Sequence, residues 1–387
     1  MTNSKKQTGR DATHRPVCSI LLIARHFPPL ISGGARRPYL LVKALCALGV
    51  RVEVIAPKLP SDVSGIEVWH PHPDPSDGPP RRPTLRDHAR SILLWPDPEI
   101  RWARRAAAAA IQSGFRPDWL ITTSPPESIH AVAPALKARL GCGWAADFRD
   151  EWLARPFLVE RRHPLRKQLE TILAKRILRS ADIVLCVDDV VGREIGELAV
   201  GKPVQILRQF SAPPEEPTQL EQLGPNLVYT GSFSLSDPGC DIAPTLCAFE
   251  GALAVRSDLT LHIAGRLTHS EREKVAASTA SASIILYGPL AYREARRLQA
   301  AADGFIVTAA PDATAIPGKV FEYRAVGCPI IAIGDGPWRQ IGGYKPGNPI
   351  DQMVSLKKYS PSMRSEPPPE TADQAARHLI SALENVV

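Results

Sequence analysis

The sequence lacks long apolar runs, a signal peptide and the common nucleotide-binding fingerprints. No stretch of the 387 residues approaches 18 consecutive apolar residues, so no segment is expected to span a bilayer. Residues 1–15 are polar without an apolar core, and we interpret them as a disordered tail, not a signal peptide. No G-x-G-x-x-G follows a strand-like segment and no G-x-x-x-x-G-K-[ST] occurs, which argues against the usual nicotinamide-dinucleotide and P-loop proteins.

Cysteine is scarce and its motifs are missing. The seven cysteines form no C-x-x-C pair and no Cys/His cluster with metal-ligand spacing, so we expect neither a metal site nor a metal cofactor. Most lie in apolar segments, which is typical of buried free thiols in a reducing compartment. The sequence therefore favours a cytoplasmic location.

The positive charge is unevenly distributed. The net charge is +7, yet residues 1–205 hold 31 Lys and Arg against 21 Asp and Glu, and the remainder is net acidic. A basic first half suggests an anionic partner, such as a membrane surface or a phosphorylated ligand; a folded protein with one basic side is the alternative. Nucleic acid is disfavoured as a partner because no aromatic-interleaved basic stripe is present.

Short apolar runs alternate with helical patterns, and this alternation occurs twice. Such a pattern indicates parallel sheets covered on both faces, so we predict an α/β fold of two doubly wound Rossmann-like domains. The first set of expected strands is 19–25, 50–57, 118–124, 143–150 and 181–188, with helices at 35–48, 101–113, 127–140 and 165–179. The second set is 226–232, 259–265, 283–290, 304–310 and 329–336, with helices at 241–255, 270–278, 291–302 and 318–326.

The proline-rich stretch 211–225 marks the domain boundary. We expect an N-terminal domain at 16–210 and a C-terminal domain at 211–370, facing each other across a cleft that would hold the ligand. A last amphipathic helix at 371–387 is expected to pack back on the N-terminal domain. The proline-studded segment 58–100 is too long for a simple connection, and we interpret it as a partly mobile loop near the cleft.

One basic segment, 161–179, is amphipathic. A single helical stripe holds Leu165, Leu169, Ile172, Leu173 and Ile177, and seven Lys and Arg lie largely elsewhere. Two interpretations stay open: the stripe packs on the sheet, or the protein is peripheral on the inner face of a membrane, with its basic face on anionic headgroups.

Glycines follow the first strand of the first domain. Gly33 and Gly34 open the first helix, where paired glycines let backbone amides approach a phosphate or a sugar closely. A plain tight turn is the alternative interpretation.

Polar residues follow two further strands at the same edge. Ser124 ends one strand and His130 falls about one turn into the next helix, while Asp147, Arg149 and Asp150 end the following strand. Alone, the histidine would be a satisfied surface residue and the acidic–basic run an internal pair. Because carboxyl ends of parallel strands form the ligand edge of such sheets, we predict a sugar- or phosphate-contacting site there.

The stretch "TAIPGKVFEYRAVGCPIIAIGDG", 314–336, is likewise expected to form a ligand site, at the start of a helix in the second domain. Pro317 suits the first turn of a helix, and Gly318 admits close approach to its amides. Lys319 would add a cation for phosphate oxygens, and Glu322 would accept the hydroxyls of a ribose. The alternative is a Lys–Glu pair on a helix surface.

These motifs together resemble a known family. The order "LLIARHFPP…GGARR", "PDWLITTSPPESIH", "ADFRDEW", "LVYTGS", "LHIAG" and "PGKVFEYRAVGCPIIA" is similar to family 4 retaining glycosyltransferases of the GT-B fold, over residues 18–340. The nearest branch is that of bacterial surface-polysaccharide and amino-sugar transferases. Within the match, "K-x-F-E-Y-x-A-x-G-x-P" is the most specific motif.

The resemblance implies roles for individual residues. His130 would lie near the reacting sugar and, with Lys319 and Glu322, would carry catalysis. The acceptor side would comprise Ser124, His130, Asp147, Arg149 and Asp150. The donor would contact Gly33, Gly34, Gly231, Ser232, Arg266, Thr314, Ile316, Pro317, Gly318, Lys319 and Glu322.

The sequence departs from the family pattern at two places. Thr314 stands where the E-x7-E motif has its first glutamate, which puts the contact with the donor sugar in doubt. Ser232 and Pro238 stand where many members have an Arg and a Lys that clamp the diphosphate. Lys319 and backbone amides would then make most of the contacts with the diphosphate, and Arg266 would be a possible substitute for the missing clamp residues.

The resemblance implies transfer of a sugar from a nucleotide-sugar, UDP- or GDP-linked, to a hydroxyl of a glycan or lipid-linked sugar, with retention and without a metal. The setting would be cell-surface polysaccharide synthesis. Two alternatives stay open: a non-catalytic GT-B protein that binds a nucleotide or acts as a scaffold, and a nucleotide-sugar 2-epimerase.

Overall fold

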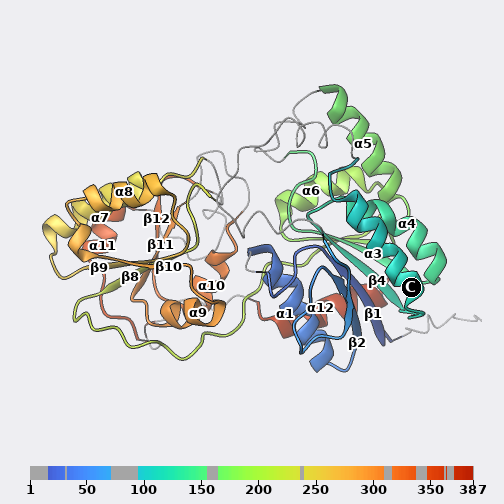
Figure 1. Ribbon diagram of the computed structural model, residues 1–387, viewed down its shortest axis with the longest axis horizontal. Coiled ribbons are helices and arrows are strands. Elements are labelled where there is room, and N and C mark those ends of the chain that lie inside the picture. Colours follow the sequence, from blue (N-terminus) through green and yellow to red (C-terminus); the bar gives the residue numbers. More distant parts are fainter. Residues whose placement is uncertain are drawn as a thin grey trace, which may run out of the picture.

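The chain folds into two α/β domains that stand side by side (Figure 1). The computed structural model describes residues 16–30, 33–70, 95–154, 164–235, 239–308, 316–336, 347–360, 363 and 370–386. Each domain is built on one parallel sheet with helices on both faces. This is the predicted fold class, the GT-B arrangement.

The N-terminal sheet has seven parallel strands in the order β3-β2-β1-β4-β5-β6-β7. They are β1 (Ser19–Ala24), β2 (Arg51–Ala56), β3 (Gly65–Glu67), β4 (Trp119–Ser124), β5 (Gly143–Phe148), β6 (Ile183–Cys186) and β7 (Val204–Ile206). The central strands are almost entirely buried, which explains their continuous apolar runs. The strand order reverses between β1 and β4, and such a switch point opens a crevice at the carboxyl ends of the strands.

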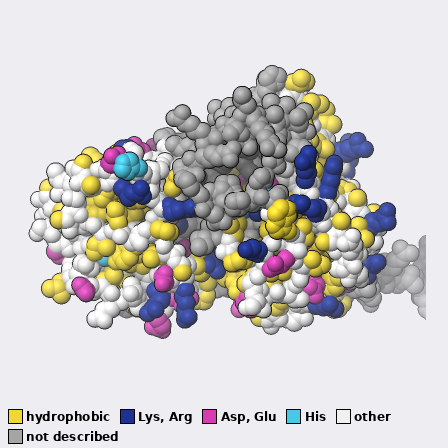
Figure 2. All heavy atoms as spheres, in the orientation of Figure 1, with side chains coloured by type: hydrophobic (Ala, Val, Ile, Leu, Met, Phe, Trp, Pro, Cys, Tyr) yellow, Lys and Arg dark blue, Asp and Glu magenta, His cyan; other side chains and the backbone are white. Residues whose placement is uncertain are grey.

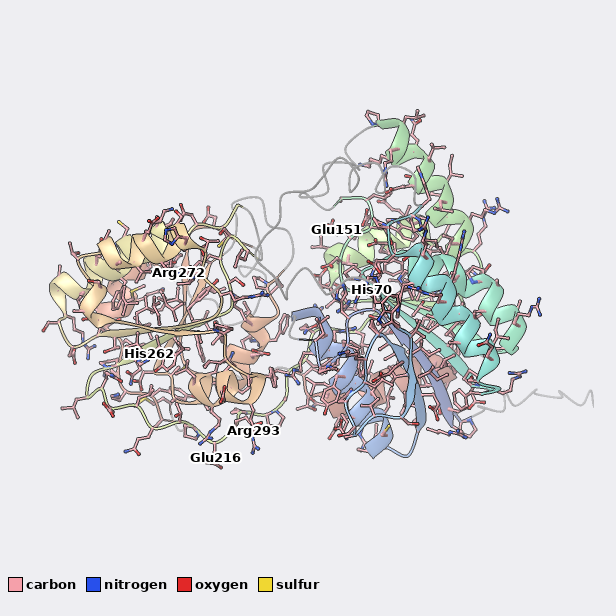
Figure 3. All side chains as sticks on the ribbon, in the orientation of Figure 1. His70, Glu151, Glu216, His262, Arg272 and Arg293 are labelled. Atoms are coloured by element: carbon pink, nitrogen blue, oxygen red, sulfur yellow. The ribbon has the colours of Figure 1, made fainter. Side chains whose placement is uncertain are left out.

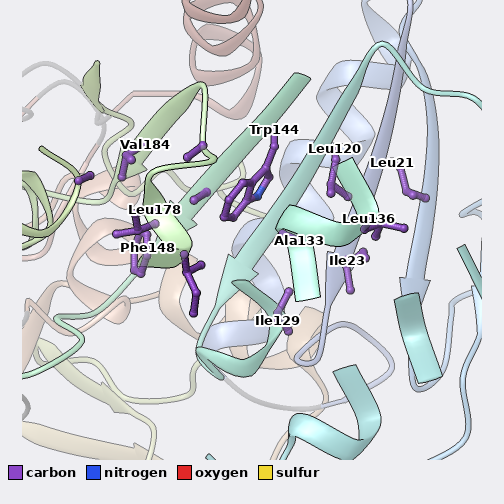
Figure 4. Close-up of a cluster of buried hydrophobic side chains, with 14 of the residues drawn as sticks. Leu21, Ile23, Leu120, Ile129, Ala133, Leu136, Trp144, Phe148, Leu178 and Val184 are labelled. Atoms are coloured by element: carbon purple, nitrogen blue, oxygen red, sulfur yellow. The ribbon is translucent and has the colours of Figure 1, made fainter. Parts of the chain in front are cut away.

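Helices cover both faces of this sheet. They are α1 (Gly33–Ala47), α3 (Ile100–Gln112), α4 (Ser128–Leu140), α5 (Pro164–Leu178) and α6 (Asp189–Leu198). On one face Ile129, Ala133 and Leu136 of α4 pack into a core cluster with Leu120 and Trp144 of the sheet (Figure 4). The sequence pattern missed α6 and the two short edge strands, β3 and β7.

The last helix, α12 (Ala372–Glu384), belongs to the opposite face of the N-terminal domain. It lies beside α1, although it follows the whole C-terminal domain in the sequence (Figure 1). Ala376, Leu379 and Leu383 are buried in the same core cluster as Leu41 and Leu45 of α1. The chain therefore crosses between the domains twice.

The C-terminal sheet has five parallel strands in the order β10-β9-β8-β11-β12. They are β8 (Asn226–Thr230), β9 (Thr260–Ala264), β10 (Ile284–Gly288), β11 (Gly304–Thr308) and β12 (Ile330–Ile333). The helices are α7 (Ala243–Val255), α8 (His269–Ala277), α9 (Tyr292–Ala300), α10 (Lys319–Val326) and α11 (Pro349–Val354), with a 3-10 turn at Ser281–Ser283. Here the switch point lies between β8 and β11.

The orientation of α5 corrects the expected stripe. Leu165, Leu169 and Ile172 are exposed, whereas Ile177 is buried against the core. The helix turns Glu170 inward, where its carboxylate accepts a hydrogen bond from Arg166 Nε at 2.9 Å. The interpretation in which the whole stripe packs on the sheet does not hold, because the first half of the stripe faces outward.

Two further expectations change in part. The long segment 58–100 contains β3, which pairs with β2; residues 71–94 of it lie outside the described residues. Of the seven free cysteines, Cys142, Cys186, Cys240 and Cys328 are buried, and the other three are exposed.

Candidate functional site

The candidate residues cluster at the two switch points. Gly33 and Gly34 begin the helix after β1, and His130 lies in the first turn of the helix after β4. In the other domain Gly231 follows β8 directly, and the segment after β11 leads to Lys319 at the start of α10. Because β1 and β4 are neighbours, as are β8 and β11, the carboxyl ends of each pair lie side by side at a switch point, where folds of this kind open a crevice.

Arg149 binds the loops of the N-terminal crevice together. Its Nε donates to the carbonyl of Ser124 at 2.8 Å, and Nη2 donates to that of Pro125 at 3.2 Å. Its Nη1 donates to the carbonyl of Gly34. A Cβ on Gly34 would lie 2.7 Å from Nη1, so only glycine leaves this arginine its place. The guanidinium of Arg149 thus holds Gly34 and Ser124 close together through hydrogen bonds.

Asp147 has an internal role in place of the acceptor contact that the resemblance implies. Its carboxylate is 3% exposed and accepts two hydrogen bonds from Arg37 Nη1, at 3.0 and 2.7 Å. Thr123 Oγ1 donates a further one at 2.7 Å. Arg37 in turn donates to the carbonyl of Leu207, where the chain leaves the sheet. This buried pair ties α1 to β5.

His130 is fully buried, not a surface residue. Its Nδ1 lies 2.8 Å from Thr122 Oγ1, and its ring packs 4.3 Å from that of Phe148, with Trp144 and Trp152 on the other sides. Burial lowers the pKa of His130 to about 4, so the imidazole is neutral near pH 7. Its Nε2 has no hydrogen-bond partner in the described structure. His130 therefore has one ring nitrogen that is buried and without a hydrogen-bond partner among the described residues.

Lys319 is held over the loop that follows β8. Its Nζ donates to the hydroxyl of Tyr229 at 2.8 Å and lies 3.9 Å from the centre of that ring. The Tyr229 hydroxyl donates onward to the carbonyl of Ser232 at 2.9 Å. Gly231 has φ +112°, and a Cβ there would lie 3.2 Å from Lys319 Nζ. Burial lowers the pKa of Lys319 to about 8, so the ammonium keeps its charge near pH 7.

Glu322 is hydrogen-bonded to partners other than Lys319, which argues against the alternative of a Lys–Glu pair on the helix surface. Its Oε2 accepts from Gln299 Nε2 at 2.9 Å, and its carbonyl accepts from Arg296 Nη1 at 3.3 Å. Gln299 Nε2 also donates to Thr230 Oγ1 at 2.8 Å. Glu322 is thereby fixed to α9 and to the end of β8, and it keeps a second carboxylate oxygen for another donor.

Arg36, which the sequence analysis missed, joins the two domains. It lies in the first turn of α1 and stacks on the ring of Tyr292 at the start of α9, 3.0 Å from its centre. Glu322 is close enough to oppose the lowering of the Arg36 pKa that burial causes. The signal was present in "GGARR", where Arg36 and Arg37 follow the glycines. This contact brings the start of the glycine helix close to the Glu322 region.

The start of α10 only partly matches the expected set of unbonded amides. The amides of Val320 and Phe321 donate to the carbonyls of Pro317 and Gly318, at 2.9 and 3.2 Å. Gly318 is exposed and a Cβ there would lie 3.9 Å from Gln209 Nε2, on the segment between the domains.

The remaining predicted residues are less closely placed. Ile316 and Arg266 are half-buried; Arg266 follows β9, next to β8. Asp150 is half-buried beyond the end of β5. Thr314 and Pro238 lie outside the described residues. Of the two departures from the family pattern, only Ser232 lies within them, and its carbonyl accepts the hydrogen bond from the Tyr229 hydroxyl.

A second charged cluster at the N-terminal edge was also missed. Arg25, directly after β1, donates through Nε to Glu99 Oε2 at 3.1 Å, and His70 Nε2 lies 2.7 Å from the same oxygen. Figure 3 shows His70 inside the N-terminal domain. Beside it Asp97 accepts from the amide of Ser128 at 2.8 Å, and burial raises its pKa to about 6. These side chains support the loops before α3 and α4.

Two kinds of feature are missing from the described residues. No three His, Cys, Asp or Glu side chains there gather as a metal-binding group. No helix in that part of the chain is long and apolar enough to cross a membrane.

Comparison with known proteins gives a family match for the N-terminal domain and a shared fold. Residues 32–208 match the family model described as a glycosyl transferase 4-like domain. No curated protein sequence matches the chain.

Solved structures share the fold over nearly the whole length. A Listeria monocytogenes protein that carries the name of a UDP-N-acetylglucosamine 2-epimerase has a TM-score of 0.56 at 14% identity, over 95% of this chain and 96% of that one. The Anabaena protein Alr3699/HepE, in complex with UDP-glucose, has a TM-score of 0.55 at 13% identity, with the same coverage. Sucrose-phosphate synthase from Thermosynechococcus elongatus has a TM-score of 0.56 at 14% identity, over 95% and 94%.

Proposed function

We propose that this protein, whose residues 32–208 form a glycosyl transferase 4-like domain on a GT-B fold, transfers a sugar from a nucleotide-sugar donor to a hydroxyl acceptor. The observation that carries the proposal is the meeting of two crevices, the glycine helix start of one domain and the Lys319–Glu322 turn of the other, joined by Arg36. A fold shared with a UDP-glucose complex supports a nucleotide-sugar, UDP- or GDP-linked, as co-substrate.

The C-terminal domain would hold the nucleotide diphosphate. Lys319, kept charged over the loop after β8, would meet the phosphates together with the backbone at Gly231 and Gly318. Glu322 would accept the ribose hydroxyls, because Gln299 donates to only one of its carboxylate oxygens, Oε2. This assignment explains why the lysine and the glutamate have separate partners.

The chemistry would be departure of the diphosphate from the anomeric carbon, followed by attack of an acceptor hydroxyl on the same face. The carboxylate of Asp147 is buried against Arg37, and that of Glu322 would hold the ribose, so neither would act as a nucleophile beside a second acid. Retention without a covalent intermediate therefore fits these residues best. The acceptor proton would pass to the departing phosphate oxygen.

The N-terminal domain would present the acceptor. Neutral His130, with Nε2 unused, would hydrogen-bond a hydroxyl of the reacting sugar or the acceptor. Arg149 would fix the surrounding loops. A glycan or a lipid-linked sugar would suit this basic domain, at the inner face of a membrane and in polysaccharide synthesis.

A 2-epimerase is the second candidate, since one protein of the same fold carries that name. It needs a pair of acid and base groups at the sugar C2, and among the described residues His130 would supply one of them through its unbonded Nε2. A non-catalytic nucleotide-binding or scaffold protein is the third candidate.

One experiment separates the three candidates. A panel of UDP- and GDP-sugars would be screened by thermal shift, and the stabilising donor incubated with and without acceptors. We expect donor stabilisation, nucleotide release, and a new glycoside with the anomeric configuration of the donor. Epimerised sugar without acceptor would favour the epimerase, and binding without turnover the scaffold.

Glu322→Gln is the matched test of the site. Because it removes the charge but keeps the shape and the Gln299 contact, we expect weaker donor binding and slower transfer with the same unfolding transition. Glu273→Gln, on the exposed side of α8, is the control. Equal transfer by both variants would contradict the assignment of Glu322.

A further inference from the structure

Helix α5 stands at the outer side of the N-terminal domain and has two different faces. The inward face is formed by Glu170, Ala174, Ile177 and Leu178, which are all buried. The outward face begins with Leu165, Leu169 and Ile172, whose exposed fractions are 59%, 46% and 64%. Spaced four and three residues apart, these three side chains form one continuous row on the helix.

Cations continue the same face toward the end of the helix. Arg176 and Arg179 follow Ile172 by four and seven residues, and Lys175 lies beside them; all three are exposed. None of them forms an ion pair with another described residue. Figure 2 shows yellow side chains near the upper end of α5 and dark blue ones below them. The face is therefore apolar for two turns and positively charged for the next.

We propose that this face of α5, together with Arg179 just after the end of the helix, docks on an anionic lipid bilayer. Leucine and isoleucine would enter the interface while the three cations meet acidic headgroups, as in helices that lie in a membrane surface. The buried ion pair of Arg166 with Glu170 fixes which side of the helix faces outward. The rotation of α5 therefore creates the docking face.

A second copy of the chain fits this face less well. A stable dimer buries on the order of 800 Å² per partner, far more than three apolar side chains supply. In a two-fold contact the cations of one copy would also meet or lie near those of the other. An anionic bilayer offers both an apolar interior for the row of leucine and isoleucine side chains and acidic headgroups for the cations.

The place of α5 gives the docking a use, which rests on the proposed transfer to a lipid-linked acceptor. In a βαβ unit the helix runs back along the sheet, so its beginning lies at the carboxyl edge of the preceding strand. That strand is β5, whose carboxyl end is followed at once by Arg149, the residue that fastens the acceptor-side loops. A membrane on the α5 face would bring a lipid-linked sugar to the same edge.

The test is co-sedimentation of the full chain with vesicles of phosphatidylcholine alone or with phosphatidylglycerol added. We expect binding only with the anionic lipid, falling steeply with salt. Replacing Lys175, Arg176 and Arg179 by Gln should weaken it by on the order of 100-fold, about fivefold per cation. Leu169→Ser with Ile172→Ser should weaken it by about tenfold or more.

Matched controls carry the same changes elsewhere. Arg101→Gln with Arg104→Gln, on exposed positions of α3, and Val255→Ser, exposed at the end of α7, should leave vesicle binding unchanged. Binding of the unaltered chain to neutral vesicles alone, no binding, or loss in the controls as well would overturn the proposal. So would a dimer in sedimentation equilibrium that the α5 changes dissociate.

A second readout separates this proposal from the proposed function. Stabilisation of each variant by the donor nucleotide-sugar, without lipid, should equal that of the unaltered chain, because α5 contributes nothing to the donor crevice. Anionic vesicle binding in a chain that no nucleotide-sugar stabilises would keep the membrane face and reject the transferase. Donor stabilisation without vesicle binding would do the reverse.

Discussion

The two crevices of this molecule hold their polar side chains in different ways. In the N-terminal domain the Asp147 carboxylate accepts hydrogen bonds from Arg37 and Thr123, and the three guanidinium nitrogens of Arg149 donate to backbone carbonyls. In the C-terminal domain Lys319 and Glu322 are half-buried. The polar side chains of the first crevice are bonded to other protein groups. In the second crevice Lys319 and Glu322 would be available to a ligand.

This contrast predicts which changes affect stability and which affect turnover. Changes to the N-terminal frame should lower the free energy of unfolding, because buried charges lose their partners. Changes to the C-terminal pair should leave folding intact and reduce donor binding. A change to Arg36, which lies between the domains, should have only a small effect on stability and on donor binding.

The largest effect should come from Asp147→Ala, which leaves the buried Arg37 guanidinium without its carboxylate. We expect the free energy of unfolding to fall by about 3–5 kcal/mol in denaturant titration. Asp62→Ala, which breaks the exposed pair with Lys43, should cost less than about 1 kcal/mol. A stable Asp147→Ala protein that fails only in transfer would show that this carboxylate serves a ligand after all.

A somewhat smaller effect should follow acidification through His130. Because the folded pKa, about 4, lies below the usual 6.5, the stability that neutral His130 contributes is complete above pH 6.5 and is lost as the pH falls toward 4. The difference amounts to about 3 kcal/mol. His130→Phe should remove that part of the pH dependence, and exposed His269→Gln should keep it. Equal profiles for both variants would refute a buried neutral imidazole.

Gly231→Ala should have a moderate effect of two kinds. A side chain at φ +112° costs about 1–2 kcal/mol of stability, and its Cβ would displace Lys319 Nζ. Gly49→Ala, at φ +85° with open space around it, should show the strain alone. Weaker nucleotide-sugar binding by calorimetry is therefore expected only for Gly231→Ala; the same affinity in both would separate Lys319 from the donor.

The smallest effect is expected for Arg36→Gln, which removes the stack on Tyr292. A cation–π contact of this kind contributes about 0.5–1 kcal/mol, so donor affinity should change by only a few fold. Arg51→Gln, which breaks a stack on Phe115 within the N-terminal domain, should not change donor affinity. A large loss of donor binding in Arg36→Gln would place this arginine on the diphosphate instead.

Sequence patterns predicted the α/β layers and the residues that follow the carboxyl ends of the strands, for a local reason. Buried parallel strands are short apolar runs, and the residues just after them must reach the same edge. The fold class followed from those runs, and Gly34, Ser124 and Arg149 do meet there.

Contacts between distant parts of the chain could not be predicted in this way. Arg37 and Asp147 are 110 residues apart, and nothing near either residue shows that they pair. The side of α5 that faces the core includes Glu170, which is buried in an ion pair with Arg166. A search for apolar residues alone does not include a glutamate, so it could not predict this orientation. The contact of Arg36 with Tyr292 likewise needs both domains in place.

The most direct test of the account is the turnover of Lys319→Met with the nucleotide-sugar that stabilises the protein most. Removing a preorganised cation from a departing diphosphate should lower kcat/KM by about 10²–10³-fold, with the unfolding transition unchanged. Lys357→Met, at an exposed position of the same domain, is the control and should transfer normally. Unchanged kcat/KM in Lys319→Met would contradict the assignment of the donor site to the C-terminal crevice.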